Sequence, residues 1–325
     1  THGINPAVVL AENQTWTNAA TVDFMVSGAI SGSRALAKRG GGRIVLANDD
    51  STFTGVLTIE EGALQVRGTN ALGTTVGGTV VEDGATLELH GGGVAVRYAT
   101  EPLTLRGAGV TNGGALRFVQ NGVDYRGDVA VAADARIQAV ADSPVLSGDV
   151  AFGTNALNVG VEATELRLGG NLSGTGPFVK DGSSRLILTG NNTNLTGVFR
   201  VEAGEVRIGT ANALGSTGLL VFGNNVVMKS TSAADFDVSR PARFDGNATF
   251  GEEATRTGTL VFEGDADLNG AMRTIAVSNP VTKWTEFAGT LSNGALTKAG
   301  AGLLVLSGTN VYAGGTTVSA GTLQG

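Results

Sequence analysis

Short stretches in which apolar and polar residues alternate recur along the whole chain. The plainest are residues 56–59, 63–67, 86–89, 165–168 and 205–208. In the last four a polar residue separates aliphatic ones, which is typical of a β-strand with one buried and one solvated face. Turn signals such as Glu61-Gly62 and Asp181-Gly182 interrupt these stretches. Residues 128–140 are long enough for a helix but also alternate, so the pattern predicts an all-β chain with negligible helix.

Three segments of the chain repeat one another, residues 36–67, 178–209 and 296–325. Each has a lysine two residues before a glycine, continues with an aliphatic strand ending in leucine, and passes through an Asn- or Asp-rich turn. Each then reaches an apolar residue followed by glycine, and closes with a glycine two residues before an aliphatic one. The third copy is one residue shorter in its turn. The shared positions include Lys38, Lys180 and Lys298; Leu46, Leu188 and Leu306; Phe53, Leu195 and Tyr312; and Gly62, Gly204 and Gly321.

Short strands, glycines at fixed offsets and recurring units favour a solenoid over a sandwich. In stacked rungs each strand pairs with the equivalent strand one turn later, about 4.8 Å away. The aliphatic residues then form inward ladders, and the corners need Gly or Asn because φ is often positive there. At about 20–25 residues per rung the chain makes roughly 13–16 rungs of a parallel β-helix. We expect one continuous β-helix over residues 1–325, with Leu46, Leu188 and Leu306 facing its core.

The third copy follows nearly throughout the pattern Lys-x-Gly-x-Gly-x-Leu-x-Leu-x-Gly-x-Asn-x-Tyr-x-Gly, from Lys298 to Gly314. The first copy departs from it at Ala47-Asn48 and the second at Ser184. This unit resembles the autotransporter-associated β-strand repeat, and residues 13–18 resemble the segment that often precedes it. The resemblance implies a right-handed parallel β-helix in a secreted or surface-anchored bacterial protein. It implies a passenger domain or stalk, and no activity.

Composition removes several classes of protein. The chain has 51 Gly among 325 residues without a three-residue period, and 42% apolar residues, which argues against collagen and against global disorder. It has no Cys, so neither disulfides nor thiolate chemistry are available. With a net charge of −7 and no basic stripe, nucleic acid is not an expected partner. No window reaches the roughly 18 apolar residues of a membrane-spanning helix.

Candidate catalytic residues are few. The histidines are His2, at the start of the chain, and His90, which ends a predicted strand. Polysaccharide-cleaving β-helices group acids on one face, and the acidic groups here are Asp49 with Asp50, Glu60 with Glu61, Glu82 with Asp83, Glu252 with Glu253, and Asp265 with Asp267. Most of them abut a glycine or lie in a turn, where acids serve solubility and capping. No stacked row of acids with a companion Arg or Lys is visible, so we expect no catalytic residue.

The remaining polar motifs have structural interpretations as well. We expect no metal and no cofactor, although the turn at Asn48, Asp49 and Asp50 offers oxygens for weak calcium binding. Asn-x-Ser/Thr sequons are explained by Asn-rich turns; they occur at Asn13, Asn171, Asn191, Asn194 and Asn247. The recurring lysines are either a basic row that binds an anionic glycan or solvated charges at strand ends that discourage edge pairing. We favour the solvated charges.

Together these observations predict a structural or adhesive β-helix module, outside the cell or at the bacterial cell surface. It is either a stalk segment of a longer passenger or a subunit that stacks end to end into a filament. In both versions we expect the strand edge at residues 314–325 to be covered. A surface glycan or a host surface is the expected partner. The alternative is a glycan-active or glycan-binding β-helix, similar to a polysaccharide lyase or hydrolase, which needs a grooved face with clustered acids.

Overall fold

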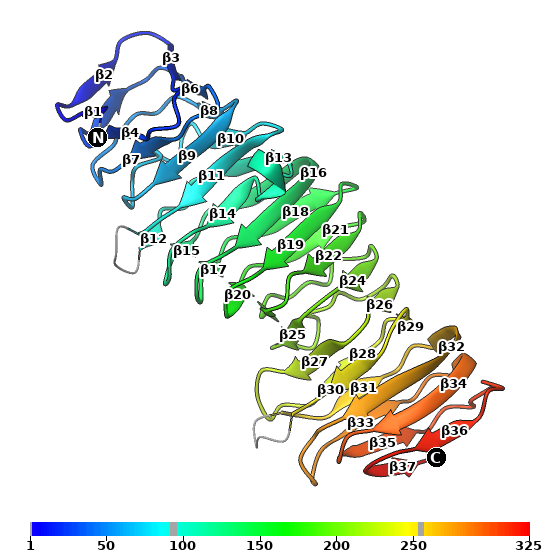
Figure 1. The fold of residues 1–325 in the computed structure, drawn as a ribbon. Helices are drawn as coiled ribbons and strands as arrows, with labels where there is room; N and C mark the ends of the chain where they lie inside the picture. Colours follow the sequence, from blue (N-terminus) through cyan, green and yellow to red (C-terminus); the bar gives the residue numbers. More distant parts are fainter. Residues whose placement is uncertain (1, 92–95, 253–256) are drawn as a thin grey trace. The chain divides into compact units, whose positions relative to one another are not determined.

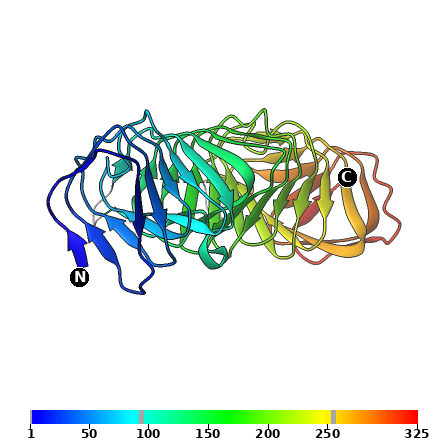
Figure 2. The same cartoon turned by 90° about the horizontal axis from the view of Figure 1, so that it is seen from above.

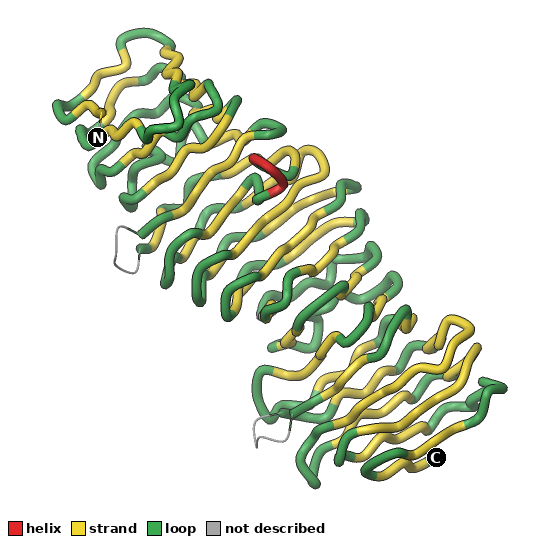
Figure 3. Tube along the Cα trace, in the orientation of Figure 1, coloured by secondary structure: helices red, strands yellow, loops and turns green. Residues whose placement is uncertain are grey.

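The computed structural model describes residues 2–91, 96–252 and 257–325, and nearly all of its regular structure is short parallel strands (Figure 1). The strands form a β-solenoid of about 14 turns. This confirms the predicted all-β parallel coil and its number of rungs. The chain divides into unit 1, residues 1–171, and unit 2, residues 172–325. The only helix in the described ranges is the 3-10 turn Val110–Asn112, which projects from a corner of unit 1 (Figure 3).

Unit 1 has three columns of strands, and each strand pairs in parallel with the strand one rung later. The first column is β1 (His2–Ile4), β4 (Phe24–Val26), β7 (Ile44–Leu46), β9 (Gly62–Val66), β11 (Ala85–Leu89), β14 (Leu116–Phe118), the end of β16 (Val129–Ala139) and β19 (Leu157–Val161). The second is β3 (Gln14–Thr17), β6 (Leu36–Arg39), β8 (Leu57–Ile59), β10 (Thr79–Val81), β13 (Leu103–Gly107), the start of β16 and β18 (Val150–Gly153). The third is β12 (Arg97–Tyr98), β15 (Asp124–Tyr125), β17 (Val145–Leu146) and β20 (Glu165–Leu168), while β2 (Val8–Leu10) and β5 (Ile30–Gly32) form a separate two-stranded sheet.

Unit 2 repeats this arrangement, and Figure 2 shows strands of successive rungs lying side by side within each unit. Its first column is β23 (Arg185–Leu188), β25 (Glu205–Ile208), β27 (Val226–Ser230), β30 (Ala248–Phe250), β32 (Ala266–Val277), β34 (Leu291–Ala299) and β36 (Thr316–Val318). The second is β22 (Phe178–Asp181), β24 (Phe199–Val201), β26 (Leu220–Phe222), β29 (Ala242–Phe244) and the starts of β32 and β34. The third is β28 (Phe236–Val238), β31 (Leu260–Phe262), β33 (Trp284–Phe287), β35 (Leu303–Leu306) and β37 (Thr322–Gln324), while β21 (Leu172–Gly174) bridges to Leu195.

The core of each unit consists of aliphatic and aromatic side chains stacked from rung to rung. Leu46, Leu188 and Leu306 are only 0%, 1% and 6% exposed, which confirms that they face the core. In unit 2 the rings of Phe178 and Phe199, on neighbouring strands, stack with centroids 4.7 Å apart. Parallel pairing therefore places similar side chains of neighbouring rungs against one another, so that few residue types fill the core.

The outward positions are less uniformly solvated than the alternation predicts. In β11 every residue is buried, including Thr86 and Glu88, and Gln65 in β9 is only 3% exposed. Glu88 is covered because Arg43, two rungs earlier, and Arg117, one rung later, form ion pairs with it. The sequence pattern missed this because the covering side chains come from other rungs.

The recurring lysines are buried, so both interpretations of them from the sequence are wrong. Lys38, Lys180 and Lys298 are at most 1% exposed. Lys38 Nζ donates to the carbonyl oxygens of Gly40, Gly42 and Glu61 at 2.5–2.6 Å. Glu61 belongs to the next rung, 23 residues later. An ammonium has three donors, so this arrangement, which we call the lysine cage, satisfies it while tying one corner to the next.

The second and third copies build the same lysine cage. Lys180 Nζ donates to Asp181, Gly182 and Ala203 oxygens at 2.7–2.9 Å. Lys298 Nζ donates to Ala299, Gly300 and Ala320 oxygens at 2.7–3.0 Å. In the first two copies the closing glycine lies against the ammonium: a Cβ on Gly62 would come within 2.7 Å of Lys38 Nζ, and a Cβ on Gly204, where φ is +74°, within 2.8 Å of Lys180 Nζ. The Lys and Gly positions of the repeat are therefore parts of one corner.

Burial lowers the pKa of Lys38 to about 8, with Glu61 acting in the opposite direction. The amine consequently keeps its proton at neutral pH, where the carbonyl oxygens accept its hydrogen bonds. Arg240 is a further buried cation, fully enclosed and donating to the carbonyl oxygens of Gly197, Leu214 and Gly218. Nothing in the sequence pattern marks Arg240, because it lies outside the three repeats.

The polar turn of each repeat has a second role. A side chain of the turn accepts a hydrogen bond from a backbone N–H one rung earlier, at the start of an Ile-Ser or Leu-Ser step that precedes each repeat. Asn192 Oδ1 accepts from Leu172 N at 2.7 Å, Asn310 Oδ1 from Leu291 N at 2.9 Å, and Ser51 Oγ from Ile30 N at 3.1 Å. These bonds satisfy buried amides that the strand columns leave unpaired. Asn and Ser in the turn are therefore structural parts of the coil.

One buried carboxyl stands out in unit 1. Glu101 is 3% exposed, its Oε1 accepts from Thr79 Oγ1 at 3.3 Å, and its Oε2 has no hydrogen-bond partner within the described residues. Tyr125 packs beside it and donates its hydroxyl to the Glu101 carbonyl oxygen at 2.7 Å. Burial raises the pKa of Glu101 to about 7. At neutral pH this group is therefore close to its own titration point.

Replacing Leu188 by Ala tests the alignment of the repeats. We expect the free energy of unfolding to fall by about 2–5 kcal/mol, because the truncation leaves a cavity that the stacked rungs cannot fill. Urea denaturation of the whole chain measures the difference. Val198→Ala is the control, since Val198 is 40% exposed and lies in the same unit. Equal effects of the two substitutions would show that Leu188 does not support the core.

The lysine cage is tested with Lys180→Met, which keeps most of the side-chain volume and removes the ammonium. Three carbonyl oxygens then lose their donor inside the protein, so we expect a loss of about 3–5 kcal/mol in the free energy of unfolding. Lys283→Met is the matched control, because Lys283 forms an ion pair with the largely exposed Asp235. There the change should stay within about 0.5 kcal/mol. A loss for Lys180→Met no larger than that of the control would contradict the role of the cage.

Glu101→Gln is expected to change how stability depends on pH. The folded state holds the Glu101 proton up to about pH 7, whereas the usual carboxyl value is 4.5. Between these values the folded state binds more protons, so its stability falls as pH rises through this window. Gln resembles the protonated acid, so the variant should be the more stable protein by about 2–4 kcal/mol at pH 8 and nearly equal at pH 4.5. A difference that is the same at all pH values in this range would contradict the assignment.

Candidate functional site

The two histidines lie in different settings. His2 is exposed in β1, and His90 is half-buried just after β11. Burial and the nearby Arg67 lower the pKa of His90. Its backbone carbonyl oxygen accepts the hydroxyl of the buried Tyr98 at 2.9 Å. The hydrogen bond from the Tyr98 hydroxyl therefore holds the backbone of His90 in place at a corner of the coil.

Most of the predicted acidic groups cap or pair with a neighbouring rung. Asp49 Oδ1 accepts from Thr69 N at 2.7 Å, and Asp265 Oδ1 from Thr290 N at 2.8 Å. Glu61 Oε2 accepts from Gly40 N at 2.9 Å. The others form ion pairs or turn bonds: Glu60 with Arg39, Glu82 with Arg106, Glu252 with Lys229, and Asp267 with Asn269 and Asn293. Asp50 is exposed, and Glu253 lies outside the described residues.

Several polar side chains of the turns are engaged in hydrogen bonds. The Asn48 side chain is buried, donates to Gly28 O and accepts from Ser51 Oγ, so it is engaged in the core. In the sequons, Asn13 Oδ1 accepts from Ala35 N and Asn247 Oδ1 from Thr274 N. Asn171 donates to Asp149, while Asn191 and Asn194 are exposed. Within the described ranges no group of three or more His, Asp or Glu side chains is arranged to hold a metal ion.

Rows of paired charges, which the sequence did not reveal, cross several rungs on the outer faces. In unit 2, Glu205 pairs with Arg185 at 2.8 Å and with Lys229 at 3.1 Å, and Glu252 pairs with Arg207 at 3.3 Å. The pKa of Glu252 is held below its usual value, first by the hydrogen bond from Lys229. Hydrogen bonds and charges of Arg207, Lys229 and Arg185 lower that of Glu205 in spite of its burial. These acids are therefore ionised partners in a ladder. The expectation that no acid row has companion bases is wrong, because strand register brings distant residues together.

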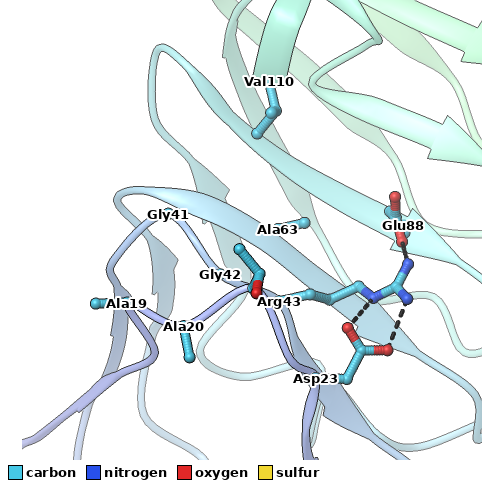
Figure 4. Close-up of a pocket in the computed structure, with 10 residues that line it drawn as sticks. Ala19, Ala20, Asp23, Gly41, Gly42, Arg43, Ala63, Glu88 and Val110 are labelled. Carbon is cyan, nitrogen blue, oxygen red and sulfur yellow. Dashed lines mark hydrogen bonds and ion pairs between the residues drawn. The ribbon is translucent and has the colours of Figure 1, made fainter.

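A groove of about 400 Å³ lies at one corner of unit 1 (Figure 4). Its walls and floor are mostly small residues, and charged side chains form one rim. The lining residues are Ala19, Ala20, Thr21, Asp23, Gly41, Gly42, Arg43, Ala63, Glu88 and Val110. They come from the loop after β3, the β6–β7 corner, β9, β11 and the 3-10 turn, so the groove crosses several rungs.

The rim of the groove is a fixed network. Arg43 Nε and Nη2 donate to the two carboxylate oxygens of Asp23 at 3.0 and 2.6 Å, and Nη1 donates to Glu88 at 3.1 Å (Figure 4). The hydrogen bond to Asp23 raises the pKa of Arg43, which keeps the guanidinium charged. Arg43 and Asp23 retain side-chain exposures of 37% and 33%. No motif in the sequence marks this pair, because neither residue lies in one of the acidic groups.

The walls are held as firmly as the rim. The buried Asn18 donates to Val22 and Arg43 carbonyl oxygens at 3.0 and 2.8 Å and accepts from Ala20 N, which shapes the loop before β4. At the other end, Val110 N donates to Thr86 Oγ1 at 2.9 Å, which in turn donates to Gly114 O at 2.9 Å. The groove is therefore pre-formed by buried hydrogen bonds.

The family model for the passenger-associated-transport-repeat matches residues 36–66, 178–208 and 296–324. Over 174 residues the chain is 30% identical to the protein described as "Adhesin BmaC autotransporter" of Brucella suis biovar 1 (strain 1330). That stretch covers 53% of this chain and 5% of the relative. No solved structure matches.

The matched residues agree with the repeats found in the sequence and contain the lysine cages. Both similarities point to a location at the cell surface or outside the cell, and suggest a role that is not enzymatic. The described ranges contain no helix with the length and apolarity that a membrane crossing requires. The chain carries three segments of the passenger-associated-transport-repeat type, at residues 36–66, 178–208 and 296–324.

Proposed function

We propose that this chain is an adhesive module, a stiff β-solenoid that presents binding surfaces outside the cell. The observation that carries the proposal is that the three segments matching the passenger repeat are the segments with lysine cages. In these segments the repeat supplies mechanical links between rungs. The outer positions, which those links leave free to vary, are available for contact with a surface glycan or a host surface. The similar protein of Brucella suis is described as an adhesin, which supports the same role.

The charges of the outer faces support a role without catalysis. A glycan-cleaving site needs one carboxyl whose pKa is raised so that it can act as an acid. In the ladder of unit 2, the pKa values of Glu205 and Glu252 are lowered. Glu101 has the raised pKa, but it is 3% exposed and lies in the core. We therefore place the glycan-active alternative second to adhesion.

Two finer features are part of the proposal. We propose a right-handed coil, because crossover connections between parallel strands of one sheet are right-handed in about 98% of cases. A stalk and an end-to-end filament both remain compatible with it. The outermost described strands β36 and β37 are exposed along Thr316–Val318 and at Thr322, and would accept a further parallel strand. The prediction of one continuous coil through residues 1–325 stays a prediction.

Adhesion is tested with latex beads coated with the purified chain and applied to epithelial cells and to extracellular-matrix films. We expect beads carrying the protein to be retained on at least one of these surfaces several-fold above albumin-coated beads, and free protein to compete for binding. Beads coated with urea-unfolded protein are the control, because the binding faces exist only in the folded coil. Retention equal to that of albumin on every surface would contradict the adhesive role.

A further inference from the structure

At the groove in unit 1, a loop that departs from the strand columns lies beside a rim of fixed charged groups. Residues 108–114 bulge outward around the 3-10 turn. Within it Thr111 and Asn112 adopt φ of 49° and 60°. For the β-branched Thr111 this left-handed conformation is costly, and such residues persist where surrounding contacts impose them. Here the bonds of Thr86 to Val110 and Gly114 impose it, which places Val110 at the end of the groove.

We propose that this groove is a binding site for an uncharged saccharide, one or two sugar rings in size. The inference rests on the adhesive role proposed above and names the ligand class of one of its surfaces. The volume of about 400 Å³ is at the lower end of the range of small-ligand sites. The groove opens to solvent, so a ligand enters without movement of the protein.

The rim offers the hydrogen-bond pattern that sugar hydroxyls need. A guanidinium carries five N–H groups, and Asp23 and Glu88 take three of those of Arg43. The two others, one on each terminal nitrogen, have no acceptor among the described residues and belong to a side chain that is 37% exposed. Each Asp23 oxygen keeps a further lone pair. Donors and acceptors therefore stand side by side, which suits neighbouring hydroxyls because each hydroxyl both donates and accepts.

The floor and the end of the groove suit the body of a sugar ring. Gly41, Gly42 and Ala63 leave a surface with almost no side chain, against which a ring can lie close to the backbone. Val110, opposite the charged rim in Figure 4, supplies an apolar contact for ring C–H groups. The walls are pre-formed by Asn18 and Thr86, so binding costs little ordering of the protein.

Charge and backbone pairing disfavour other ligands. Asp23 and Glu88 balance Arg43 and Arg117, which leaves the rim neutral and without a preference for an anion or a metal ion. The backbones of β4, β7 and β9 pair with one another, so a peptide cannot add to them as a strand. A neutral polar ligand of low affinity remains. For an adhesin, weak sites are effective because many copies on one surface bind together.

The test uses saturation-transfer NMR of the full chain with lactose, N-acetyllactosamine and methyl mannoside, and with sialyllactose and galacturonic acid as charged probes. We expect saturable binding of at least one neutral sugar, with a dissociation constant on the order of 1 mM, and weaker binding of the charged ones. No saturable binding of any neutral probe would overturn the proposal, as would tighter binding of the charged probes.

Two variants locate the site. Gly41→Trp fills the groove at a position where a Cβ meets nothing within 4 Å, and should weaken binding at least tenfold. Ala151→Trp, on an exposed position of β18 outside the groove, is the matched control and should bind as the unmodified chain does. Asp23→Asn keeps the groove open but removes one charge, so it should shift preference toward the charged probes. Full binding by both Gly41→Trp and Asp23→Asn would exclude the groove.

The bead assay separates this inference from the adhesive role. Gly41→Trp beads that adhere as well as unmodified ones, together with sugar binding lost in solution, would leave adhesion standing and assign it to another face. If Gly41→Trp beads adhere as well as unmodified ones and the variant still binds sugar, the groove is not the sugar site, and the adhesive role stands. Circular dichroism and thermal unfolding of each variant show that the coil is intact, and Asp23→Asn provides the answer if Gly41→Trp does not fold.

Discussion

A coil of short strands must turn several times in every rung, and each corner directs backbone carbonyl oxygens away from the strand columns. Water cannot reach the inner ones, so they need donors from the chain itself. The lysine cage supplies three donors from one side chain and joins the corners of two rungs. The remaining features of the repeat follow from this constraint. The glycines make room for the ammonium, and the turn Asn or Ser bonds the amide one rung earlier.

The same constraint explains why the lysine cages and Arg240 are placed against carbonyl oxygens. A carboxylate would neutralise an ammonium but would leave the corner carbonyls unpaired. Arg240, outside the repeats, meets the same need by donating to three carbonyl oxygens. Charges of opposite sign are paired on the outer faces instead, as in the ladder of Glu205, Lys229 and Glu252. The core thus depends on ammonium and guanidinium groups, and the surface on ion pairs across rungs.

Because these hydrogen bonds hold the rungs together from the inside, residues at outward-facing positions can change without loss of the coil. The bulge at residues 108–114 adds a wall to one corner while the columns on either side continue. Strand β14 pairs in register with β11 and β16, and β13 with β10, whereas the register of β13 against β16 shifts between Leu105 and Gly107. The groove beside Arg43 is a product of that freedom. A surface protein gains from such a division because contact faces can change while the links that hold the rungs stay the same.

The sequence by itself determined the all-β coil, the three repeats and their family, and the inward leucines such as Leu188. These features depend on the alternation of apolar and polar residues and on spacings within about one and a half turns of the coil. Both can be read directly from the order of residues along the chain. The sequence also showed that the lysines matter, but not why: their burial is decided by carbonyl oxygens on the next rung, such as Ala203 for Lys180.

Only the tertiary structure decided the charge ladders, the buried Glu101 and the groove. Arg43 and Glu88 are 45 residues apart, two rungs, and no short-range pattern joins them. Each such contact depends on the register in which one rung stacks on another. That register is set by the packing of the whole column, so the sequence near either residue does not contain it.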